Sequence, residues 1–195
     1  QAPLPLWPVA TRIDVGSPTI WAARYLTMNG KRRLSGSFTH GTMACALTHA
    51  VGAQTAFPDR QVIALAGDGG LAMMFGELLT LVQNNLPVKV VVFNNSSLNF
   101  VELEMKSAGV VNFGTDLKNP DFGAVAQAIG ISGRRVEQPG DVEQAVADAL
   151  AHPGPALIDV VVSREELSIP PAISAEQAKE YGLIDVVLES RKANT

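Results

Sequence analysis

The sequence is poor in cysteine and has no cluster of basic residues beyond "KRR" at 31–33. The single cysteine, Cys45, excludes an internal disulfide and a cysteine-based zinc site. It lies in an alanine-rich stretch, so we interpret it as a buried structural thiol. The net charge is −4 and no basic stripe is present, which argues against nucleic acid as a partner.

Long apolar runs are also missing. None approaches the roughly 18 residues that a membrane-spanning helix needs, and no charged segment followed by an apolar one indicates a secretory signal. The sequence therefore predicts a cytoplasmic protein. Its start, "QAPLPLWPVATRIDVG", has no methionine and is rich in proline. We interpret residues 1–12 as a linker or cut end, and the chain as a piece of a longer protein.

The sequence is instead rich in alternating strand and helix patterns. With 195 residues, 47% hydrophobic and 17% charged, it fits one compact domain. Unbroken apolar runs predict buried parallel strands, and helical patterns lie between them. Strands are predicted at 61–67, 88–95 and 156–162, with shorter ones at 11–16 and 31–37; helices at 41–57, 70–85, 119–130 and 140–152, with the tail 174–195 as a further candidate. This order predicts a doubly wound α/β fold, with a mainly parallel sheet covered by helices on both faces.

Two polar motifs follow neighbouring predicted strands. "GDGG" stands at 67–70 and "NN" at 94–95. Ligands of such sheets bind beyond the carboxyl ends of the strands, so both motifs are candidates for one site. The first also fits the dinucleotide pattern G-x-G-x-x-A. Against that interpretation, the second strand ends on neutral asparagines where a ribose-binding acid is needed, and Asp68 would face a pyrophosphate with nothing to offset the repulsion.

A divalent cation removes this charge conflict. Mg²⁺ takes oxygen ligands from carboxylates, carbonyls, phosphates and water. Asp68, the side-chain carbonyl of Asn95 and a backbone carbonyl near Ser97 would supply three ligands. A simpler interpretation stays open, with Asp68 as a helix cap or turn residue and 94–95 as a turn.

The interval between the two motifs resembles the thiamine-diphosphate-binding motif, a GDG followed some two dozen residues later by NN. Longer stretches, "GSFTHGTMACALTHAVGAQTAFPDRQVIALAGDGG" and "LPVKVVVFNNSSLNFVELEMKSAG", resemble the carboxy-terminal thiamine-binding (PP) domain of bacterial pyruvate oxidases and pyruvate:quinone dehydrogenases. The resemblance covers about residues 13–181. It implies a PP domain at 13–190 with a short tail at 191–195, and thiamine diphosphate and Mg²⁺ as cofactors.

The resemblance also assigns roles. It implies that Asp68, Asn95 and the Ser97 carbonyl hold Mg²⁺, and that Gly41 offers its carbonyl to the aminopyrimidine. Met43 would lie beneath the bent cofactor, although helix core is the alternative. The backbone would approach the diphosphate at three glycines, Gly67, Gly69 and Gly70.

Phe100 and Glu104 match an active-site aromatic and carboxylate of those enzymes. For Glu104 a solvated helix face is the alternative interpretation. Among the histidines, His40 precedes the Gly41 turn and is a candidate near the ring, whereas His49 is interpreted as structural.

The activity implied is oxidative decarboxylation of pyruvate to acetate, with FAD on a middle domain and electrons passed to a quinone such as ubiquinone. A separate PYR domain, on a partner subunit of a homo-oligomer such as a homotetramer, would complete the cofactor site. Nothing in this chain resembles the PYR or FAD domain, so we expect the chain alone to be inactive and to expose an apolar patch near 41–57 and 71–82. The tail "DVVLESRKANT" stops short of a full basic amphipathic helix, which argues against peripheral membrane docking.

Two other functions remain open. One is the PP domain of a related thiamine-dependent enzyme such as acetohydroxyacid synthase, which shares the motif but joins carbons. The other is a non-catalytic isolated domain that acts in binding or assembly.

Overall fold

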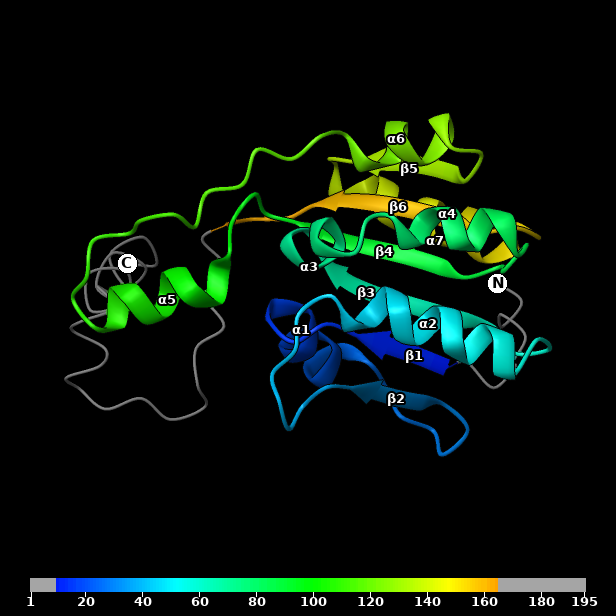
Figure 1. The fold of residues 1–195 in the computed structure, drawn as a ribbon, viewed down its shortest axis with the longest axis horizontal. Coiled ribbons are helices and arrows are strands. Elements are labelled where there is room, and N and C mark those ends of the chain that lie inside the picture. Colours follow the sequence, from blue (N-terminus) through cyan, green and yellow to red (C-terminus); the bar gives the residue numbers. More distant parts are fainter. Residues whose placement is uncertain (1–9, 165–195) are drawn as a thin grey trace, which may run out of the picture.

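A computed structural model describes residues 10–164, which form one parallel α/β domain (Figure 1). The predicted tail helix at 174–195 lies outside the described residues. The strands are β1 Ala10–Ile13, β2 Arg33–Gly36, β3 Val62–Gly67, β4 Lys89–Asn94, β5 Ser132–Val136 and β6 Ala156–Val161. The helices are α1 Ser17–Tyr25, α2 Cys45–Ala56, α3 Asp68–Met73, α4 Glu77–Gln83, α5 Asn99–Ser107, α6 Phe122–Ala128 and α7 Val142–Ala151, with a 3₁₀ turn, η1, at Pro139–Asp141.

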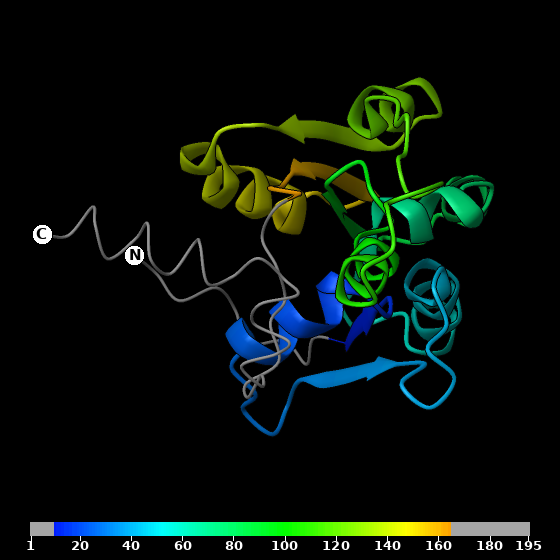
Figure 2. The same ribbon diagram turned by 90° about the vertical axis from the view of Figure 1, so that its left-hand side faces the viewer.

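The six strands are all parallel, in the order β2-β1-β3-β4-β6-β5. Helices α1 and α7 lie on one face of this sheet, and α2, α4 and α6 lie on the other (Figure 2). The sheet confirms the predicted fold class. Because β3 and β4 are neighbours and run in the same direction, their carboxyl ends meet at one edge.

The core explains why these segments form central strands. Every second residue of β3, beginning at Val62, is buried, and so are Val90 and Val92 of β4. β-Branched side chains pack well on a pleated surface, and here they meet the small residues of α2, such as Ala46 and Ala50. Within residues 10–164, no helix combines the length and apolar character needed to cross a membrane.

The predicted helix at 70–85 is wrong in one respect, because it is two helices. Helix α3 ends at Met73, and α4 begins at Glu77 after Gly76. Glycine is a poor helix former. Phe75, between the two helices, packs instead against Phe122 of α6, with ring centroids 5.9 Å apart. Tertiary packing of one aromatic side chain thus outweighs the local helical pattern.

Strand β5 and helix α1 are among the elements that the sequence patterns did not predict. Strand β5, "SGRRV", lies at the sheet edge and carries two arginines, so it shows no apolar run. Charged side chains of this kind are common on edge strands. Helix α1 has Pro18 in its first turn, where the missing N–H costs no hydrogen bond.

Candidate cofactor-binding site

A pocket of about 340 Å³ opens at the carboxyl edge of the sheet. Its walls come from the ends of β3 and β4, the turn before α2, the segment after β1, and α5. Helix α5 lies beyond the strand ends (Figure 1). The pocket brings together the ten residues to which the resemblance assigns a site role: Gly41, Met43, Gly67, Asp68, Gly69, Gly70, Asn95, Ser97, Phe100 and Glu104. Their individual roles stay predictions.

Asp68 is the charged group at the centre of this edge, and only 3% of it is exposed. Its Oδ1 accepts a hydrogen bond from the Gly69 N–H at 2.9 Å. Its Oδ2 accepts from the Ser96 N–H and from Asn119 Nδ2, each at 2.7 Å. Within residues 10–164 no lysine or arginine pairs with it. Burial raises the pKa of Asp68, although these amide donors act in the opposite direction.

The two asparagines at the end of β4 point to different surroundings, as alternate residues of a strand do. Asn94 is buried and donates from Nδ2 to Asp159 at 2.9 Å. Asn95 lines the pocket, and its Oδ1 accepts from the Ser97 N–H at 3.0 Å. This turn is the one that the simpler interpretation predicts. A carbonyl oxygen has two lone pairs, so Asn95 keeps acceptor capacity for a ligand.

Two glycines of "GDGG", Gly69 and Gly70, lie where a side chain has no room. A Cβ on Gly69 would lie 2.7 Å from Leu98 Cδ2 and 3.2 Å from Met43 Cε, both in the pocket wall. A Cβ on Gly70 would meet the Asp14 carboxylate and the Ala44 N. Glycine at these two positions therefore lets the backbone of α3 pack closely against the residues of the pocket wall.

These residues fit a diphosphate held through Mg²⁺. A buried carboxylate without a cationic partner is costly, and a cation would offset that cost. Asp68 and the Asn95 and Ser97 carbonyls are oxygen donors of the kind that Mg²⁺ prefers. No group of three or more His, Cys, Asp or Glu side chains suited to a metal is found in residues 10–164. Mg²⁺ prefers octahedral coordination, so three protein oxygens would leave positions for phosphate oxygens and water.

Other predicted features have different outcomes. Phe100 is half-buried in the pocket wall, and Glu104 is exposed at its margin, on α5. His40 is exposed and does not line the pocket, so its candidacy near the ring finds no support. His49 is also exposed, on α2, and it does not line the pocket either. Cys45 is buried as predicted, with its thiol donating to the Ile13 carbonyl at 3.3 Å.

Sequence reasoning missed several buried or half-buried polar groups around the pocket. Asp14, after β1, lines it directly. Glu102 accepts from the Ser97 hydroxyl at 2.6 Å. Asn119 reaches Asp68 from a loop far along the chain. A signal for Asp14 was present, since "DVGSPT" follows a strand at the same edge of the sheet. Glu102 and Asn119 have no local signal, because only the tertiary fold brings them here.

Comparison with known proteins gives the family. Residues 14–160 match the model described as "Thiamine pyrophosphate enzyme, C-terminal TPP binding domain". The chain belongs to this family of C-terminal thiamine pyrophosphate-binding domains. That range contains the whole sheet except its first strand and part of its last, and it includes all of the predicted site residues.

Similar proteins refine the comparison. The chain is 36% identical to YdaP of Bacillus subtilis (strain 168), which is named, without a firm assignment, as a thiamine pyrophosphate-containing protein; the match covers 87% of this chain and 29% of that protein. It is 39% identical to the acetolactate synthase large subunit of Parasynechococcus marenigrum (strain WH8102), over 80% of this chain and 26% of the relative. It is 35% identical to acetolactate synthase 2, chloroplastic, of Zea mays, over 80% of this chain and 26% of the relative.

These relatives correct the narrower resemblance. They support a thiamine pyrophosphate enzyme, but not pyruvate oxidase specifically. The chain spans less than a third of the length of each of them.

Proposed function

We propose that this domain binds the diphosphate of thiamine diphosphate through Mg²⁺, as one part of an enzyme that decarboxylates pyruvate. The observation that carries the proposal is the buried Asp68 carboxylate, which faces a glycine-lined pocket without a cationic partner in residues 10–164. Bound thiamine diphosphate supplies an electron sink for the carbanion that decarboxylation creates.

In this proposal each part of the pocket has a defined task. Asp68 and the carbonyls of Asn95 and Ser97 bind the cation. The Gly41 carbonyl and Met43 position the cofactor's ring end. Three glycines admit the diphosphate to the backbone: Gly67, Gly69 and Gly70. Phe100 and Glu104, on α5, face the substrate side.

The fate of the decarboxylated carbons separates two activities. Relatives named as acetolactate synthases favour joining them to a second 2-oxo acid. Oxidation to acetate is the second candidate, and it requires FAD and a quinone acceptor. Both activities need a PYR domain, which we place outside this chain, in a homo-oligomer. An assay of the protein at its natural length with pyruvate, thiamine diphosphate and Mg²⁺ decides between the two activities. The carbon-joining activity yields acetolactate. The oxidising activity yields acetate, and only when FAD and an electron acceptor are added.

The binding proposal is tested on this chain by calorimetry. Asp68→Asn keeps the shape of the side chain but removes its charge. We expect the affinity for thiamine diphosphate in the presence of Mg²⁺ to fall roughly 100-fold, since a direct ligand matters at least as much as its supporting partners. Asp148→Asn, on α7 and outside the pocket lining, is the matched control. Equal binding by wild type and Asp68→Asn contradicts the proposal.

A further inference from the structure

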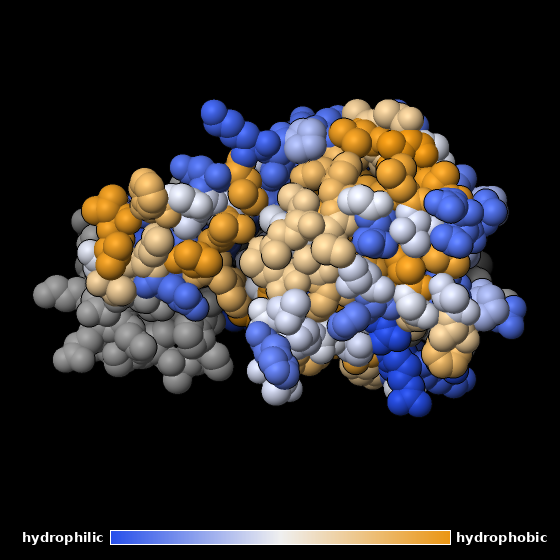
Figure 3. All heavy atoms as spheres, viewed as in Figure 1, coloured by the Kyte–Doolittle hydropathy of each residue, from blue (hydrophilic) through white to orange (hydrophobic). Residues whose placement is uncertain are grey.

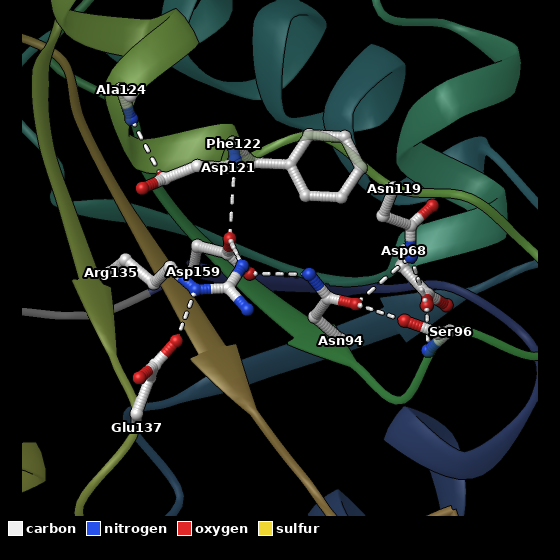
Figure 4. Close-up of polar contacts among 10 residues, drawn as sticks. All are labelled: Asp68, Asn94, Ser96, Asn119, Asp121, Phe122, Ala124, Arg135, Glu137 and Asp159. Carbon is white, nitrogen blue, oxygen red and sulfur yellow. Dashed lines mark hydrogen bonds and ion pairs between the residues drawn. The ribbon is translucent and has the colours of Figure 1, made fainter.

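Asn119 joins the two strand ends that carry the site. It lies on the loop between α5 and α6, and it is distant in sequence from both strands (Figure 4). Its Nδ2 donates to Asp68 Oδ2 at 2.7 Å and to Asn94 Oδ1 at 2.9 Å. One amide group therefore links the residue that follows β3 to the last residue of β4.

The direction of these hydrogen bonds is determined by a carboxylate on β6. Asp159 is completely buried, and an ionised carboxylate can only accept. Asn94 must therefore present Nδ2 to Asp159, which leaves its Oδ1 to face Asn119. Arg135 and the Phe122 N–H both donate to Asp159 Oδ2, at 2.8 and 3.1 Å, and hold that carboxylate in place.

Asn119 is consequently confined to one role, that of a donor. Both of its partners, Asp68 Oδ2 and Asn94 Oδ1, are acceptors, so a carboxylate or an apolar side chain at 119 would remove one hydrogen bond from each of them. The loop that carries Asn119 is itself fastened to the loop after β4: Leu117 N donates to the Ser96 carbonyl at 2.9 Å, and Leu98 N to the Thr115 carbonyl at 2.8 Å. The donor is thus supplied by a fixed segment.

We propose that Asn119 is a positioning residue for the metal-binding carboxylate: it holds Asp68 in the orientation that the cation needs before the cation arrives. The proposal rests on the proposed function. Among the donors to Asp68 within residues 10–164, Asn119 contributes a side chain, whereas Gly69 and Ser96 contribute backbone N–H groups at the strand ends. Without Asn119 the Asp68 carboxylate is less constrained. The cation must then order this carboxylate as it binds, and the entropy that this costs weakens metal binding.

Calorimetric titration of the full chain with Mg²⁺, at a fixed concentration of thiamine diphosphate, tests this inference. We expect Asn119→Ala to bind Mg²⁺ 10- to 100-fold more weakly than wild type, the range typical of groups that support metal ligands. Asn112→Ala is the matched control, because Asn112 lies on the same loop, is also half-buried, and has no contact with Asp68. Its affinity should stay within about twofold of wild type.

A second variant gives a readout that a purely structural role would not produce. Asn119→Asp places a second carboxylate beside Asp68, so its melting temperature without divalent cation should lie below that of wild type. Added Mg²⁺ should raise the melting temperature of this variant more than that of wild type, because the cation offsets the added charge. An equal deficit with and without Mg²⁺ indicates a structural role and overturns the inference.

The outcomes separate this inference from the function beneath it. If wild type shows no Mg²⁺-dependent binding of thiamine diphosphate, the proposed function fails and the inference fails with it. If wild type binds and Asn119→Ala binds equally well or more tightly, only the inference fails.

Discussion

Asp14 has a buried carboxylate of which only one oxygen accepts a hydrogen bond within residues 10–164. Its Oδ1 accepts from the Ala46 N–H at 2.7 Å, at the start of α2. Its Oδ2, beside Gly70, has no donor among residues 10–164. Burial raises the pKa of Asp14 from 3.8 to about 6, although the backbone N–H of Ala46 lowers it. At neutral pH the fold therefore carries an ionised and incompletely satisfied carboxylate against the pocket.

The sign of its effect on stability follows from that raised pKa. Between pH 3.8 and about 6 the folded state binds more protons at Asp14 than the unfolded state does. The contribution of Asp14 to the free energy of unfolding therefore falls as pH rises through this window. Above about pH 6 the ionised Asp14 destabilises the folded state by the full amount. We expect Asp14→Asn to be about 2 kcal/mol more stable than wild type at pH 7, and close to wild type below pH 4.

Urea denaturation across this pH range measures the difference between the two proteins. Asp59→Asn, an exposed site, is the control and should show no such trend. A difference between Asp14→Asn and wild type that does not change with pH contradicts this account.

At the scale of elements, α5 depends on polar contacts for its place. The helix lies beyond the sheet, and of its residues with described side chains only Asn99 and Glu102 are buried. Glu102 pairs with Lys106 and Arg164, each at 2.9 Å, and accepts from the Ser97 hydroxyl. Burial alone would raise the pKa of Glu102, but these partners lower it to about 2. This one carboxylate therefore connects α5 with the loop after β4 and with the chain after β6.

Removing the Glu102 charge should loosen that connection. We expect Glu102→Gln to lower the free energy of unfolding by about 2 kcal/mol at pH 7, with part of the ion-pair energy discounted because Lys106 and Arg164 are partly exposed. Hydrogen exchange should be faster in the variant than in wild type in α5 but not in β3, which would show that the loss of stability is local to α5. Glu143→Gln, at an exposed position on α7, should leave both measurements unchanged. Uniform or absent change would show that α5 does not depend on Glu102.

At the scale of the whole molecule, an apolar area is exposed over α3 and toward α4 (Figure 3). Met73 is 64% exposed and Leu79 is 56% exposed. The predicted patch at 71–82 is therefore present, whereas in 41–57 Phe57 is the large apolar residue at the surface. Exposed apolar areas of this kind favour association.

We expect the chain to self-associate through this area as its concentration rises. Replacing Met73 and Leu79 together by glutamate should shift its mass toward that of a monomer in size-exclusion chromatography with light scattering. Gln83→Glu with Gln144→Glu adds the same charge at exposed polar positions, and its mass should match that of wild type. Equal masses for all three proteins would contradict this prediction.

The sequence by itself determined the central sheet and which residues line the pocket. Apolar runs such as 88–95 are buried on one face and half-buried on the other, and such runs are typical of parallel strands covered by helices. The glycines around Asp68 and the interval from Asp68 to Asn95 can likewise be recognised from the sequence. Each depends only on residue type and spacing. All ten predicted site residues consequently line one pocket.

The tertiary structure alone decided how that pocket is supported. Phe75 divides a helical pattern because Phe122 lies opposite. Strand β5 joins the sheet despite its arginines because Arg135 pairs with the buried Asp159 of β6. Asn119 reaches Asp68 across 51 positions of the sequence, and Asp159 sets the direction of its hydrogen bond through Asn94. Contacts of this kind join residues that are distant in the sequence. They depend on how the whole chain folds, and residue type and spacing do not predict them.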